Sequence, residues 1–152
     1  MGGGAEAVSA TIEGEGIVMD TIAEKDYSRE NVIAHEIAHQ WWGDLTTFRS
    51  WEHTWLNESF GTYSDYLYTR FDKGEDAGAY DLLGKKNQYL NEAHNRYMRP
   101  IVFNRYDDPN DNFDSHTYPK GACMLHLLRY ILGDDTFFRT LSTFLHQNEF
   151  KP

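Results

Sequence analysis

The chain has 152 residues, of which 40% are hydrophobic and 15% aromatic, so residues 1–152 are expected to form one folded domain. Its formal net charge of -10 disfavours a nucleic-acid partner, because phosphate binding requires clustered lysine and arginine side chains. No apolar run approaches the roughly 18 residues of a spanning helix, which excludes membrane insertion of this chain.

The N-terminal region alternates between apolar and polar residues and is interrupted by Gly14 and Gly16. This pattern predicts two strands, over residues 7–12 and 17–19, joined by a tight turn. Because an isolated hairpin is only marginally stable, it must pack on the rest of the chain or belong to a larger sheet.

Three helices are predicted next. The first runs from a capping Ser28 to Trp42 and ends at Gly43. The second begins near Thr54 and ends at Gly74, and the third covers residues 76–97.

A polar stretch rich in Asp, Asn and Pro, residues 99–116, predicts a long surface loop, and loops of this length are often functional. A further helix is predicted from Pro119 to Leu132, followed by a last one that Asp135 caps. The predicted fold class is α+β and mostly α, with a small β-hairpin at the N-terminal end.

The first predicted helix carries the sequence H-E-x-x-H, formed by His35, Glu36 and His39. Histidines four positions apart project from one helix face, so two imidazoles can reach one zinc ion. A hydrolytic zinc site needs a third ligand from another element, and Glu58, near the start of the next helix, is the candidate. Glu36 then lies beside the metal, where a general base for the attacking water belongs.

Other polar residues receive weaker or structural interpretations. Asp65 is either a hydrogen-bond partner of a ligand histidine or a solvated helix carboxylate. The single Cys123 cannot form an internal disulfide, which favours a cytoplasmic setting but leaves the compartment open. No second metal site is predicted from the remaining histidines, which are assigned to packing or surface roles: His53, His94, His116, His126 and His146.

The run HEIAHQWWGDLTTFRSWEHTWLNESFGTYSDY, residues 35–66, closely resembles the signature of gluzincin aminopeptidases of the aminopeptidase N type, which also include the leukotriene hydrolases. The resemblance implies a thermolysin-like zinc metallopeptidase catalytic domain that binds one Zn²⁺ ion. Members of this family are much longer, so the chain resembles a catalytic core whose flanking domains are missing.

Two further segments resemble motifs of the same family. Residues 116–122 are similar to its Tyr-x-Lys-Gly block, which implies that Tyr118 donates a hydrogen bond to the oxyanion of the tetrahedral intermediate. Residues 3–7 are similar to its Gly-x-Met-Glu-Asn motif, which implies that Glu6 binds the free α-amine of the substrate. Ala5 and Ala7 stand where Met and Asn are usual, and Ser59 stands where Gly is common.

The resemblance implies an enzyme that hydrolyses N-terminal residues from peptides with a free N-terminus. Two alternatives stay open at this point. One is an endopeptidase or epoxide-type hydrolase that uses the same metal, and the other is a non-catalytic, zinc-stabilised fragment.

Overall fold

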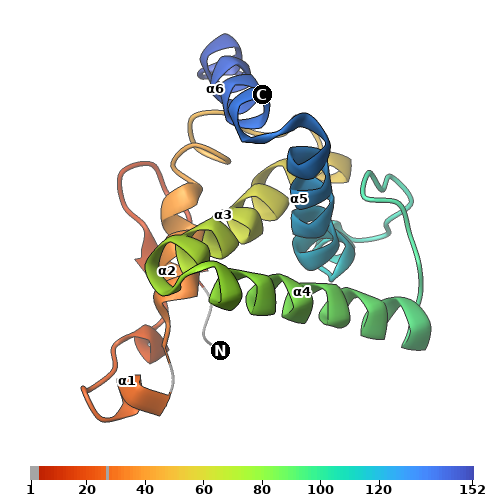
Figure 1. Cartoon of the computed structure of the whole chain (residues 1–152). Coiled ribbons are helices and arrows are strands. Elements are labelled where there is room, and N and C mark those ends of the chain that lie inside the picture. Colours follow the sequence, from red (N-terminus) through yellow and green to blue (C-terminus); the bar gives the residue numbers. More distant parts are fainter. Residues whose placement is uncertain (1–3, 27) are drawn as a thin grey trace.

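A computed structural model describes residues 4–26 and 28–152 of the chain. Its described part is mostly helical, and a two-stranded sheet lies at the N-terminal end (Figure 1). The elements, in chain order, are β1 (Gly4–Ala5), β2 (Ile12–Glu13), α1 (Ala23–Asp26), α2 (Glu30–Ala38), α3 (Trp55–Lys73), α4 (Glu75–Asn95), α5 (Gly121–Leu132) and α6 (Asp134–Asn148). Figure 1 shows α1 projecting from one end of the molecule and α6 lying at the other.

Helix α3 is the centre of the fold, because α2, α4 and α5 all pack against it. Aromatic and aliphatic side chains from several elements enclose a core around α3. The buried members of this core are Trp42, Phe60, Tyr63, Tyr66, Ala122, Leu125 and Phe137. The sequence pattern of this helix also predicts Phe71 as a core residue; that prediction is wrong, because Phe71 is 89% exposed near the C-terminal end of α3.

Most helix boundaries agree with the sequence-based expectations. Helix α3 begins after Thr54 and ends at Gly74, whose φ of 92° is a conformation that glycine adopts without steric cost. Helices α4 and α5 confirm the two following predictions within a few residues. Helix α6 begins at Asp134 with Gly133 as its N-cap, so the expected cap at Asp135 is wrong.

Helix α2 is shorter than predicted, because it ends at Ala38 and continues as tight turns up to Gly43. Gly43 has φ of 144°, and its backbone N–H donates to the Thr46 carbonyl. Ser28 accepts a hydrogen bond from the Glu30 N–H at 3.3 Å, although Arg29 occupies the N-cap position. The sequence also places Tyr27 and Val32 where a hydrophobic staple would pack, and Tyr27 falls outside the described residues.

The strands of the N-terminal hairpin differ from the prediction. Residues 7–11 form a loop between β1 and β2, and residues 15–17 form a short 3₁₀ turn. The amide of Gln40 explains this loop, since it donates to the Ala7 carbonyl and accepts from the Ser9 N–H, both at 3.0 Å. Backbone groups that a strand would pair with a neighbour are therefore bonded to a side chain.

None of the helices in the described part of the chain has both the length and the apolar character needed to cross a membrane. The expectation that residues 1–152 form one domain stays a prediction.

Candidate active site

The three predicted metal ligands converge on one point. His35 and His39 project from α2, and Glu58 lies in the first turn of α3. The Glu58 Oε2 atom lies 3.3 Å from Nε2 of His35 and 3.5 Å from Nε2 of His39. One donor atom from each of the three residues lies within 4.8 Å of the other two. The residues therefore meet in the way the spacing of the motif predicts.

The orientation of each imidazole is fixed by a neighbouring group. Nδ1 of His39 donates to the Trp42 carbonyl at 2.8 Å, which leaves Nε2 as the atom that faces Glu58. The ring of His35 lies over Gly61, where an added Cβ would come within 2.8 Å of the ring. The turn after α2 and a glycine inside α3 thus make room for two correctly turned rings.

The electrostatics of the three residues suit a divalent cation. Burial alone would raise the pKa of Glu58, but its bonds to the two histidines hold that pKa at about 2. Burial would lower the pKa of His39, yet Glu58 and the Trp42 carbonyl raise it to about 9. A buried carboxylate thus sits between two imidazoles that face it, and two His with one Glu is the donor set of hydrolytic zinc sites.

Glu36 lies beside these ligands and is 7% exposed. Its Oε2 atom has no hydrogen-bond partner within the described residues, and burial raises its pKa. Strand β1 passes directly over it, since an added Cβ at Gly4 would come within 2.4 Å of the Glu36 carboxyl carbon. A carboxylate without a partner and with a raised pKa is suited to accept a proton from a water molecule.

Glu6 follows β1 and reaches the same region from the other side. One of its carboxylate oxygens forms a close group with donor atoms of Glu36 and His39, all within 4.8 Å of one another. Glu6 is half-buried, which leaves its carboxylate open to a cationic partner. The structure therefore brings Glu6 next to the predicted general base.

Tyr118 reaches the site from the π-helical turn His116–Lys120, which precedes α5. Its ring stacks on His35 with centroids 6.1 Å apart and an interplanar angle of 23°. Burial, followed by the negative charge of Glu58, raises the pKa of the phenol well above its usual range. The hydroxyl therefore stays protonated and can donate a hydrogen bond.

Asp65 does not occupy either of the two environments that its sequence position allowed. It is 9% exposed and pairs with Lys85 at 2.6 Å, and within the described residues no hydrogen bond joins it to His35 or His39. Lys85 also pairs with Asp81 at 2.7 Å, so these residues fasten α4 to α3. No local pattern around Asp65 indicates a partner twenty residues away.

A second group of possible metal donors, Glu92, Asp114 and His116, lies near the end of α4. Its carboxylates are already engaged by arginines: Arg99 contacts both oxygens of Asp114, and Arg96 contacts Glu92 at 2.9 Å. A buried arginine supplies the charge that a metal ion would otherwise supply, so this group is an ion-pair network.

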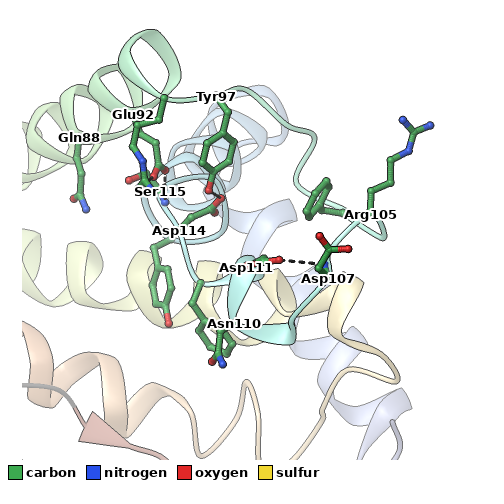
Figure 2. A pocket seen from close by; sticks show the side chains of 13 residues that line it. Gln88, Glu92, Tyr97, Arg105, Asp107, Asn110, Asp111, Asp114 and Ser115 are labelled. Carbon is green, nitrogen blue, oxygen red and sulfur yellow. Dashed lines mark hydrogen bonds and ion pairs between the residues drawn. The ribbon is translucent and has the colours of Figure 1, made fainter.

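A cavity of about 660 Å³ opens beside Tyr118 (Figure 2). Its walls come from the end of α4, the segment 103–115 and the π-helical turn. In Figure 2 the Tyr97 hydroxyl points toward Asp114, to which it donates at 2.7 Å, and Arg105 points outward. The polar stretch predicted as a loop thus forms one wall of a hollow next to the site.

Two histidines four positions apart face a glutamate on the next long helix. This arrangement places the chain among the zinc metallopeptidases. More narrowly, the model of the Peptidase family M1 domain matches residues 2–152, and the chain belongs to that family. Solved structures that this chain resembles are M1 zinc metallopeptidases, so zinc is the cofactor, as the sequence predicted.

Curated relatives and solved structures agree with this assignment. Aminopeptidase Ey of Gallus gallus is 38% identical over 128 residues, which are 76% of this chain and 12% of that protein. The alanine/arginine aminopeptidase of Saccharomyces cerevisiae is 37% identical over 123 residues, which are 79% of this chain and 14% of that protein. The chain therefore spans less than a sixth of the length of these relatives.

The structure of native yeast LTA4 hydrolase superposes with a TM-score of 0.84 at 29% identity, over 98% of this chain and 24% of that one. The M1 zinc metallopeptidase from Deinococcus radiodurans gives a TM-score of 0.67 at 31% identity, over 82% and 27%. The predicted fold class and the resemblance to gluzincin aminopeptidases are confirmed by these matches.

Proposed function

We propose that the chain is the catalytic core of a zinc-dependent aminopeptidase that hydrolyses the N-terminal residue from peptides. The observation that carries this proposal is the convergence of His35, His39 and Glu58, with Glu36 beside them and unpaired. Relatives with the same family domain are named aminopeptidases.

In this proposal His35, His39 and Glu58 hold the metal. When bound, a zinc ion supplies a Lewis acid that polarises the scissile carbonyl and makes a neighbouring water more acidic. Glu36 accepts a proton from that water and later returns it to the leaving amine, which its raised pKa favours. Tyr118 donates its phenolic hydrogen to the oxygen on which negative charge develops.

Glu6 accounts for the choice of substrate. A carboxylate beside the general base pairs with an N-terminal ammonium and gives an internal peptide bond no equivalent partner. A variant of the Deinococcus radiodurans structure was solved bound to a Tyr-Ser-Ala substrate, a short peptide of the class proposed here. Its TM-score with this chain is 0.67, at 30% identity over 89% of this chain and 28% of that one.

The two alternatives differ from this proposal in measurable ways. An endopeptidase or epoxide-type hydrolase would not distinguish a free from a blocked N-terminus. A non-catalytic fragment would bind zinc without hydrolysing any peptide. The names of the relatives do not favour either alternative, and the position of Glu6 favours the free-amine substrate.

Metal content and hydrolysis of an aminoacyl reporter, each measured with and without chelator, test the proposal. We expect one zinc ion per chain, turnover of the free-amine reporter that chelator removes, and little turnover of its acetylated form. His39→Ala should lose both zinc and turnover. His53→Ala, at a partly exposed position where the ring lies 3.4 Å from Glu52, is the matched control. Equal turnover of the acetylated reporter contradicts the aminopeptidase assignment.

A further inference from the structure

Glu58 lies on α3, and Tyr118 lies on the π-helical turn. The distance between these two elements determines whether the Tyr118 hydroxyl can reach the site. Each has a neighbour in the chain that is fully buried: Ser59 follows Glu58 and is 0% exposed, and Thr117 precedes Tyr118 and is 1% exposed. The Ser59 hydroxyl donates to the Thr117 carbonyl at 2.6 Å. One direct hydrogen bond thus joins α3 to the π-helical turn next to both residues.

This hydrogen bond gives the Thr117 carbonyl a donor from a neighbouring helix. In a regular α-helix the Gly121 N–H would donate to the Thr117 carbonyl, but here it donates to the Tyr118 carbonyl. A buried carbonyl without a donor is costly, so the Ser59 hydroxyl stabilises the turn in this particular position.

The fit around the hydroxyl is close. An added Cβ at Gly121 would come within 1.8 Å of Ser59 Oγ, so the glycine admits the serine side chain between α3 and α5. Ser59 stands where the resembled motif commonly has glycine, which makes this contact a property of this chain's own sequence.

Thr117 is held from its other side as well. Its hydroxyl accepts a hydrogen bond from Nη2 of Arg99 at 2.8 Å, and Arg99 is itself paired with Asp114. Because Ser59 binds the carbonyl and Arg99 binds the side chain, Thr117 cannot shift without breaking a buried bond. Because Tyr118 follows Thr117 directly, the backbone of Tyr118 is restrained as well.

We propose that Ser59 is a positioning residue for Tyr118: its hydrogen bond to Thr117 sets the distance between the π-helical turn and the helix that carries Glu58. The part of this inference that concerns turnover rests on the proposed function, because it uses Tyr118 as the oxyanion donor. The part that concerns the placement of Tyr118 does not depend on activity.

The placement is tested by NMR of the tyrosine rings in the full chain. The Tyr118 ring signal is assigned by its disappearance in Tyr118→Phe. Ser59→Ala should move that signal, whereas Ser64→Ala should leave it in place, because the Ser64 hydroxyl bonds only within α3, to the Phe60 carbonyl at 2.8 Å. An unmoved Tyr118 signal in folded Ser59→Ala overturns the proposal. Should that variant fail to fold, the same measurement on Ser59→Gly, which carries the residue common in the resembled motif and has no hydroxyl, decides it.

Kinetics supply the second readout. Ser59→Ala should lower kcat about tenfold with KM and zinc content unchanged, since a misplaced donor weakens only the transition state. The same substitution in a Tyr118→Phe background should cost nothing further, because its effect passes through the hydroxyl that is already absent. A full tenfold loss in both backgrounds contradicts a positioning role. A wild-type chain without turnover refutes the proposed function instead, while the NMR result still stands.

Discussion

The helical body and the N-terminal segment hold their parts of the site by different means. Glu58 and Tyr118 are fixed by helix packing and by buried hydrogen bonds that cross between elements. Glu6 lies on a segment whose sheet, among the described residues, pairs Gly4 with Glu13 and Ala5 with Ile12. Val8 and Val18 in this segment are 72% and 87% exposed, so little apolar burial holds it in place.

In the proposed mechanism, this contrast separates two functions of the cleft. Metal binding and proton transfer would depend on the helical body, whereas recognition of the substrate amine would depend on the N-terminal segment. Substitutions in the helical body are therefore expected to affect stability or kcat, and substitutions that release the segment are expected to affect KM for free-amine substrates.

Glu36→Gln should produce the largest effect and shows whether the body carries the chemistry. The amide keeps the shape of the side chain but cannot accept the proton, so we expect kcat to fall on the order of a thousandfold or more. Zinc content should not change, because Glu36 is not among the three converging ligands. Glu24→Gln on α1 is a matched control, and wild-type turnover in Glu36→Gln refutes the general-base role.

Arg99→Ala should have the largest effect on stability. It removes a buried guanidinium, 6% exposed, that pairs with Asp114, and leaves that buried carboxylate without its positively charged partner. We expect the free energy of unfolding, measured in urea, to fall by about 3–5 kcal/mol. Arg96→Ala is the control, because its side chain is 69% exposed and such pairs contribute less than about 1 kcal/mol. Equal losses in both variants would contradict the importance of burial.

Tyr118→Phe tests the hydroxyl without disturbing the ring that stacks on His35. Loss of an oxyanion donor should lower kcat on the order of a hundredfold with zinc content unchanged. Tyr80→Phe, at a position 79% exposed, should behave like the wild type. An unchanged rate in Tyr118→Phe removes this residue from the mechanism.

Gln40→Ala should produce the smallest effect and acts on the N-terminal segment alone. It removes both hydrogen bonds that hold the loop after Glu6, at Ala7 and Ser9. We expect KM for free-amine reporters to rise about fivefold, equivalent to roughly 1 kcal/mol of lost positioning. Neither kcat nor zinc content should change. Gln147→Ala, at an exposed position on α6, is the control, and a loss of kcat instead of KM would contradict the separation of the two regions.

The sequence predicted that His35 and His39 lie on one side because that follows from helix geometry, and Glu58 is the acid near the start of the next predicted helix. Two histidines four positions apart share a face wherever the helix forms, and Thr54 and Gly74 mark the ends of the helix that supplies Glu58. Helices α4 and α5 were predictable for the same reason, since their signals are local. Tyr118 and Glu6 came from the family resemblance, and the roles of all these residues stay predictions.

The features that the sequence did not predict all depend on partners far along the chain. Alternation over residues 7–12 indicated a strand, but the Gln40 side chain takes its backbone hydrogen bonds. The bond between Ser59 and Thr117 spans 58 positions, and no local pattern announces it. The first predicted helix is apolar nearly all round, yet Ile37 and Trp41 are 49% and 51% exposed, because no described element covers them.

At Gly61, the residue that would favour helix formation differs from the residue that the site requires. Alanine there would favour α3 by up to about 1 kcal/mol, since glycine is a poor residue inside a helix. Yet its methyl group would occupy the space that the His35 ring fills. Selection for helix propensity alone would therefore favour Gly61→Ala, which would displace the imidazole of His35. Glycine is the residue that leaves room for that ring.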